Sequence, residues 1–121
     1  MTDFIALDTE TANPNLSSIC QVGIAEFHDG MLVDEREWLV DPEDYFHGMN
    51  VRIHGIHASD VKGKPIWKEV YPELRALLNK KVIVTHTPFD RNSVRRVCDK
   101  YQTERLECVW VDSAKRTRQP S

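Results

Sequence analysis

The distribution of apolar and polar positions divides the first half of the chain into three strand-like segments. A short apolar run predicts a buried strand that ends in acidic residues, and two longer segments predict further strands. Asp29-Gly30 is typical of a hairpin turn between the second and third strands. Turn signals also follow the first strand and close the third. The predicted strands cover residues 4–7, 19–27 and 31–40, with turns at 13–15 and 41–42.

The second half alternates between helical and strand-like patterns. Residues 67–79 place their apolar side chains on one helical face, and Val82-Ile83-Val84 predicts a short strand. Pro88 is well suited to the first turn of a second helix, whose apolar positions continue to Tyr101. Residues 108–111 predict a last strand. Residues 41–66 show no clear periodicity, so we expect an irregular segment, and such segments are often functional.

The predicted order is β-β-β-α-β-α-β. Three strands joined by hairpins, followed by strands alternating with helices, imply an α/β fold with a mixed sheet and helices packed against it. A chain of 121 residues is long enough for one hydrophobic core, so we expect one domain over residues 1–121.

Composition excludes several classes of protein. Apolar residues make up 40% and charged residues 29%, which argues against disorder, and no apolar run approaches the roughly 20 residues of a membrane-spanning helix. The three cysteines form no CxxC pair, which indicates free thiols in a reducing cytoplasm. The net charge of −3 argues against a protein that coats nucleic acid. It is less damaging for an enzyme that grips a strand end, because bound cations can supply positive charge.

Asp8 and Glu10 are the most informative polar residues. They flank Thr9 at the end of the first predicted strand, and alternate residues of a strand point to the same side. Two neighbouring carboxylates repel each other unless a divalent cation lies between them, and oxygen ligands suit Mg²⁺ or Mn²⁺. Surface charge or a helix cap would explain this pair equally simply.

Asp90 adds a third acid in a similar position. It follows the strand 82–84 and lies in the first turn of the next helix. If the two strands are neighbours, Asp90 can meet Asp8 and Glu10 across their ends. The alternative is a favourable placement of an acid near a positive helix N-terminus.

Together these segments resemble the DEDDh 3′-5′ exonucleases, the superfamily of the polymerase III proofreading subunit and ribonuclease T. Residues 4–11, Phe-Ile-Ala-Leu-Asp-Thr-Glu-Thr, are similar to the first motif, and residues 86–90, His-Thr-Pro-Phe-Asp, resemble the second. Between them, Ile53-His54-Gly55-Ile56 resembles an H-G-I loop, and residues 110–113 resemble a W-x-D-T segment. The resemblance runs from about Phe4 to Arg118.

The resemblance implies a ribonuclease H-like sheet and a two-metal mechanism on a single-stranded DNA or RNA 3′ end. One Mg²⁺ or Mn²⁺ would activate the attacking water and the other would stabilise the leaving 3′ oxygen. Asp8, Glu10 and Asp90 would hold the metals. Thr9 and Thr11 would offer backbone groups to the terminal nucleotide, and Phe89 would support the site by packing. His54 would contact the substrate end or make a structural hydrogen bond, and His86 would be a buried support.

One family motif, H-x-x-x-x-D, has no counterpart. No histidine follows His86, and Asp99 and Asp112 are the only aspartates after Asp90. Thr87 also replaces the usual asparagine of the second motif. We therefore expect the N-terminal portion of an exonuclease domain, lacking the last helices and inactive or weakly active as it stands.

Three explanations stay open for the missing motif: a truncated exonuclease, a non-catalytic module that binds nucleic acid or protein, and an enzyme completed by another chain. The uncovered sheet face could support a homo-oligomer. The choice between DNA and RNA also stays open.

Overall fold

The computed structural model describes residues 3–113, and the remaining residues of the predicted domain lie outside this part. Its elements are, in order, β1 (Phe4–Thr11), β2 (Ile19–His28), β3 (Met31–Leu39), α1 (Gly48–His54), α2 (Ala58–Val61), α3 (Trp67–Leu78), β4 (Val82–Thr85), α4 (Pro88–Tyr101) and β5 (Val109–Asp112). The predicted α/β order is confirmed, with two short helices added.

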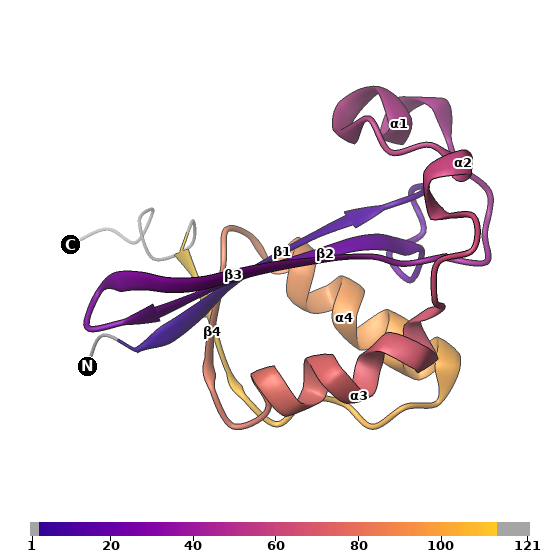
Figure 1. The fold of residues 1–121 in the computed structure, drawn as a ribbon. Helices are drawn as coiled ribbons and strands as arrows, with labels where there is room; N and C mark the ends of the chain where they lie inside the picture. Colours follow the sequence, from indigo (N-terminus) through magenta and orange to yellow (C-terminus); the bar gives the residue numbers. More distant parts are fainter. Residues whose placement is uncertain (1–2, 114–121) are drawn as a thin grey trace.

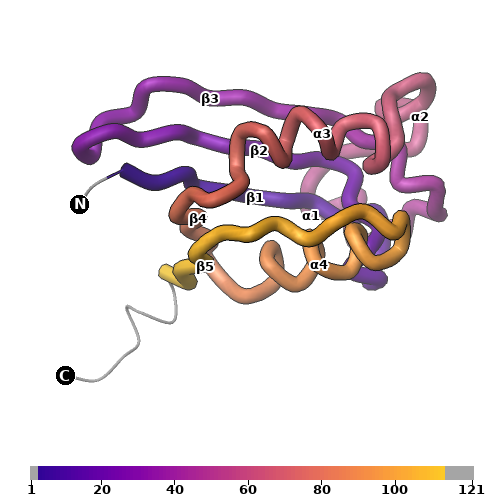
Figure 2. Tube along the Cα trace, turned by 90° about the horizontal axis from the view of Figure 1, so that it is seen from below, coloured from indigo at the N-terminus to yellow at the C-terminus, as the bar shows by residue number. Residues whose placement is uncertain are grey.

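The five strands form one mixed sheet in the order β3-β2-β1-β4-β5. The first three strands pair antiparallel, whereas β4 runs parallel to both β1 and β5. Figure 2 shows the strands side by side in this order. The parallel register aligns Ile5 with Ile83 and Ala6 with Val84. The C-terminal ends of β1 and β4 therefore lie next to each other at the same end of the sheet.

Helices α3 and α4 cover one face of the sheet (Figure 1). Alternate residues of the strands point toward them and form the core with the apolar faces of both helices. Its fully buried members include Ile19, Val22, Val40, Leu74, Ile83, Val97 and Cys98. No helix in the described part lies over the opposite face, where Figure 1 shows the sheet bare except near α1 and α2.

The prediction of an irregular segment over residues 41–66 was wrong for α1 and α2. Helix α1 buries none of its residues, so it carries no apolar periodicity to reveal it. It ends at Gly55, whose φ of 76° is a left-handed conformation that favours glycine. A small cluster of Cys20, Ile56 and Val61 holds this segment against the end of the sheet.

Candidate active site

Asp8 and Glu10 lie on the bare face of β1, close to the edge where β1 and β4 end. Burial alternates along β1, with Leu7 and Thr9 buried on the helix side, Asp8 exposed and Glu10 half-buried. The predicted common orientation of the two carboxylates therefore agrees with the pleat of the strand.

Asp90 lies near the same strand ends but belongs to helix α4. The Thr87 hydroxyl caps this helix by accepting a hydrogen bond from the Phe89 N–H, and Pro88 occupies its first turn. Asp90 follows in that turn and is only 4% exposed. Its Oδ1 accepts two hydrogen bonds from Thr9, from the backbone N–H at 2.9 Å and from the hydroxyl at 2.8 Å.

The three carboxylates lie within electrostatic range of one another. Burial raises the pKa of Glu10, and the charges of Asp8 and Asp90 raise it further, whereas His54 lowers it. Burial also raises the pKa of Asp90; the hydrogen bonds from Thr9 oppose this shift, and Asp8 reinforces it. The protein's own groups therefore do not fully balance the negative charge of these acids, which is typical of functional sites.

The three carboxylates by themselves do not form a complete metal-binding site. Among residues 3–113, no three His, Cys, Asp or Glu side chains converge closely enough to hold a metal ion. Mutual repulsion keeps carboxylates apart, and Thr9 holds Oδ1 of Asp90. The donor set nevertheless suits a hard divalent cation, because it consists of carboxylate oxygens whose repulsion a cation would relieve. Thr9 does not engage Oδ2 of Asp90, which is the oxygen that could serve as a ligand.

A groove of about 220 Å³ adjoins Glu10 and runs between β1, α1 and α4. Ile53 and Phe89 lie in its lining and are 80% and 38% exposed. Exposed apolar side chains beside a carboxylate give the groove both an apolar wall and a charged end. Its full lining is Glu10, Thr11, Pro14, Asn50, Ile53, His54 and Phe89.

His54 lines this groove, but backbone groups engage both of its ring nitrogens. Nδ1 accepts a hydrogen bond from the Ile56 N–H at 3.0 Å, so the proton of a neutral ring lies on Nε2. Nε2 then donates to the Thr11 carbonyl at 2.9 Å. This geometry favours the structural alternative for His54.

The backbone groups of Thr9 and Thr11 take part in hydrogen bonds within the site. The Thr9 N–H is bonded to Asp90, and the Thr11 carbonyl accepts from both His54 and Asn50. These two groups are engaged within the protein, and the contact of Thr9 and Thr11 backbone groups with a terminal nucleotide stays a prediction.

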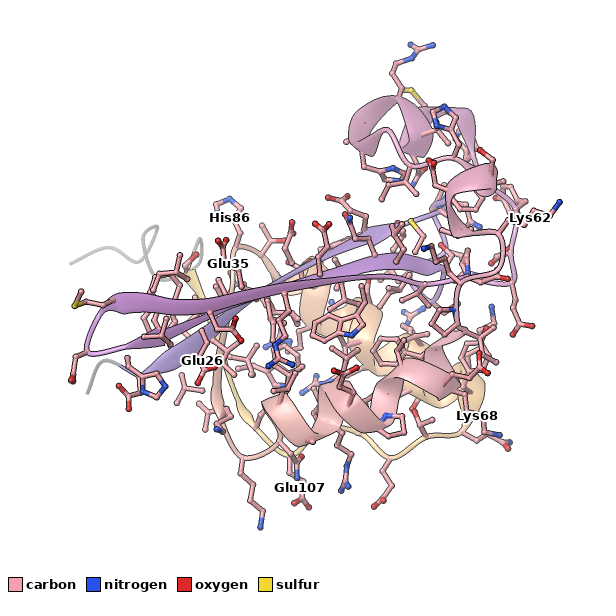
Figure 3. All side chains as sticks on the ribbon, in the orientation of Figure 1. Glu26, Glu35, Lys62, Lys68, His86 and Glu107 are labelled. Carbon is pink, nitrogen blue, oxygen red and sulfur yellow. The ribbon has the colours of Figure 1, made fainter. Side chains whose placement is uncertain are left out.

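His86 is less buried than predicted, and Phe89 lies at the surface beside it. Phe89 is exposed and lies at the wall of the groove, and its support of the site by packing stays a prediction. His86 is exposed and points away from α3 and α4 (Figure 3), so it is not a buried support. Both residues lie where the chain passes from β4 into the exposed first turn of α4.

The sequence did not single out Asn50. Its Nδ2 donates to the Thr11 carbonyl at 3.1 Å and to the Thr11 hydroxyl at 3.3 Å. Asn50 and His54 are four residues apart on α1, so both reach the same strand end. Had a helix been predicted over this segment, its periodicity would have placed Asn50 and His54 on one face and identified them as a pair.

Comparison with known proteins begins with the fold. Exonuclease X in complex with 5′ overhanging duplex DNA has a TM-score of 0.72 and 24% identity, covering 95% of this chain and 64% of that chain. A 3′-exonuclease with 3′-end specific recognition of a histone mRNA stem-loop has a TM-score of 0.72 and 14% identity, covering 86% and 55%. These similarities confirm the ribonuclease H-like α/β fold.

Sequence relationships define the family. The profile of the RNase T exonuclease family matches residues 5–112. A PolC-type DNA polymerase III from Thermotoga petrophila is 32% identical over 113 residues, which are 91% of this chain and 8% of that protein. The chain belongs to this exonuclease family, within the DEDDh-type superfamily, and spans a small part of that much longer relative.

Proposed function

We propose that the chain is a 3′-5′ exonuclease domain that uses divalent cations to hydrolyse nucleic acid from its 3′ end. The observation that carries the proposal is that three carboxylates, Asp8 and Glu10 from β1 and Asp90 from α4, lie within electrostatic range of one another near the C-terminal end of β1. Burial and the charges of neighbouring carboxylates raise the pKa of Glu10 and of Asp90, as expected for acids whose negative charge a bound cation would balance. Membership of the exonuclease family supports this interpretation.

Asp8, Glu10 and Asp90 would hold Mg²⁺ or Mn²⁺. When bound, the cations would supply Lewis-acid activation of water and neutralise charge at the phosphodiester. The protein's own contribution is orientation. The groove beside Glu10 would hold the terminal nucleotide, with Ile53 and Phe89 against the base and the His54 ring along its side.

Cleavage assays with protected oligonucleotides test the direction of attack. A 5′-labelled single strand incubated with the chain and Mn²⁺ should shorten from its 3′ end. A phosphorothioate at the 3′-terminal linkage should protect it, whereas one at the 5′ end should not. Protection by the 5′ block alone would contradict the proposed polarity. Matched DNA and RNA strands in the same assay decide the substrate class.

We also propose that these 121 residues cleave slowly, because no histidine follows His86 to act as the general base of the missing motif. The second candidate, a non-catalytic module that binds nucleic acid or protein, would show no metal-dependent turnover at all. Anisotropy measurements with a labelled oligonucleotide distinguish the two. Binding with slow, Mn²⁺-dependent cleavage supports the enzyme, and binding without any metal-dependent turnover supports the module.

Self-association through the bare sheet face forms part of this proposal. Val82 and Val84 pair with Val109 and Val111, and all four point away from the buried Ile83 side. This patch is uncharged, so two copies can meet there without burying unpaired charges. Glu35 and Glu37 line the β3 side of the same face, where two copies would repel each other.

Sedimentation velocity tests this contact. Val109 is 60% exposed, and Val109→Glu should shift a dimer toward monomer. Met49→Glu is the matched control, because Met49 is 57% exposed on α1, away from the sheet face. A wild-type chain that stays monomeric at high concentration would contradict the proposal.

None of the helices within residues 3–113 has the length and apolar character to span a bilayer. We also propose the cytoplasm as its location. Cys20, Cys98 and Cys108 are free thiols in the structure, in keeping with a reducing compartment. Cell fractionation of a tagged chain tests this location, and recovery in an extracellular fraction would contradict it.

A further inference from the structure

Thr9 lies between the two β1 carboxylates but faces the other way. It is 3% exposed and directs its side chain toward α4, whereas Asp8 and Glu10 point to the bare face. Both of its hydrogen bonds end on one atom, Oδ1 of Asp90, which is 81 residues away in the sequence. Thr9 is therefore a direct link between the first and second motifs.

This link restricts how the Asp90 carboxylate can turn. The donating N–H belongs to β1 where Thr9 is paired with Val22 of β2, and this pairing holds the position of the N–H. The hydroxyl sits on a β-branched side chain with restricted rotation, buried among its neighbours. Two donors on one oxygen hold the plane of the carboxylate and leave Oδ2 as the oxygen that Thr9 does not engage.

We propose that Thr9 is a positioning residue, whose amide and hydroxyl hold Oδ1 of Asp90 and so present Oδ2 to the cation that Asp8 and Glu10 would share. The inference rests on the proposed function, because it requires Asp90 to be a metal ligand. Groups that orient ligands in this way typically change metal affinity by about 10- to 100-fold when they are removed.

A purely structural cross-link is the competing role for Thr9. Both roles predict that loss of the hydroxyl lowers stability, because a buried charge loses a hydrogen bond. They differ in their effect on metal affinity. A positioning residue changes the affinity for Mn²⁺, whereas a cross-link changes only the unfolding temperature of the metal-free protein.

Calorimetric titration of the 121-residue chain with Mn²⁺ alone separates the two roles. Thr9→Val keeps the branched shape and removes the hydroxyl, and it should weaken Mn²⁺ binding about tenfold. Thr9→Ser restores the hydroxyl and should bind within about twofold of wild type. Thr9→Ala gives the same comparison as Thr9→Val if valine is not tolerated.

Ser93→Ala is the matched control. Ser93 is fully buried one turn after Asp90, and its hydroxyl has no hydrogen-bond partner within the described residues. Removing that hydroxyl should leave Mn²⁺ affinity unchanged. Thermal unfolding without metal, recorded for every variant, separates a change in stability from a change in affinity.

Full Mn²⁺ affinity in Thr9→Val, with only a lower unfolding temperature, would overturn the role of Thr9 while leaving the proposed function intact. Asp90→Ala tests whether Asp90 is a metal ligand, on which the role of Thr9 depends. If Mn²⁺ binding survives that substitution, Asp90 is not a ligand, and the proposed function and the role of Thr9 both fall. Loss of binding in Asp90→Ala together with tenfold weakening in Thr9→Val supports both.

Discussion

The two ends of strand β1 carry charges in opposite ways. Just before the first residue of β1, Asp3 lies 3.4 Å from His28, which in turn lies 2.9 Å from Glu26. The pKa of Asp3 is lowered by the Asp29 backbone N–H and by His28, and the pKa of His28 is raised by Glu26. When His28 is protonated, Asp3 and Glu26 both face a charge of opposite sign at an exposed surface.

At the other end of β1, like charges meet and are partly buried. Glu10 and Asp90 both have raised pKa values, caused first by burial and reinforced by neighbouring carboxylates. The first end is stabilised by the protein itself, whereas the second carries negative charge that the protein does not balance. This difference is the physical basis for proposing a cation site at the second end.

The largest expected effect is the loss of metal-dependent stabilisation. With Mn²⁺ at about 100 times its Kd, the free energy of unfolding should rise by about 2.7 kcal/mol, because the ion binds only the folded state. Asp8→Asn should remove this gain, while Asp3→Asn at the other end should retain it. Chemical denaturation with and without Mn²⁺ measures both, and equal gains in the two variants would erase the difference between the ends.

Removing one negative charge from each end should have different consequences for the stability of the metal-free protein. Glu10→Gln relieves repulsion and should raise the free energy of unfolding by roughly 1 kcal/mol, within the range of single substitutions. Glu26→Gln removes a partner of His28 and should not stabilise the protein. Urea unfolding of the two variants measures this comparison. Destabilisation by Glu10→Gln would contradict the proposed repulsion.

The pH dependence of the metal-free protein should show the same asymmetry. A carboxyl whose pKa is raised in the folded state binds its proton more tightly there, so its ionisation destabilises the fold. The stability of wild type relative to Glu10→Gln should therefore fall as the pH rises from the ordinary pKa of 4.5 through the raised value. Unfolding temperatures of both proteins between about pH 4 and pH 8 test the sign. A constant difference would show that Glu10 does not titrate as described.

The smallest effect should come from His28, because exposed ion pairs contribute little. Its raised pKa means that its stabilising charge is fully present below the ordinary value of 6.5 and is lost as the pH rises through the raised value. His28→Gln should lower the unfolding temperature by about 1–2 °C at most at acidic pH, and not at alkaline pH. High salt should remove the difference. An effect as large as that of Glu10→Gln would contradict the comparison.

Much of the fold could be predicted from local patterns. The helices starting at Trp67 and Pro88 show apolar periodicity and start signals, and the hairpin follows from Asp29-Gly30. Helix α1 could not be predicted in this way, because it buries no residue and depends on side-chain contacts made by Asn50 and His54. Such contacts arise only after β1 and α1 have packed together.

The candidate site, like the fold, could be predicted only where local sequence patterns determine it. The shared orientation of Asp8 and Glu10 follows from the period of a strand, and their nearness to Asp90 follows from the parallel pairing of β1 with β4. The bond between Thr9 and Asp90 joins residues 81 positions apart and has no local signature. The resemblance implies that Thr9 offers backbone groups to the terminal nucleotide, and the structure adds that the N–H and hydroxyl of Thr9 donate to Asp90 in the second motif.

Calorimetric titration of the intact 121-residue chain with Mn²⁺, beside Asp8→Ala and Asp3→Ala, tests the central claim most directly. The three carboxylates at the end of β1 predict binding by wild type and by Asp3→Ala, and a loss of at least about 100-fold in Asp8→Ala, because a ligand carboxylate is removed. Binding that is unchanged by Asp8→Ala, or absent from wild type, would contradict the assignment of this acidic cluster as a cation site.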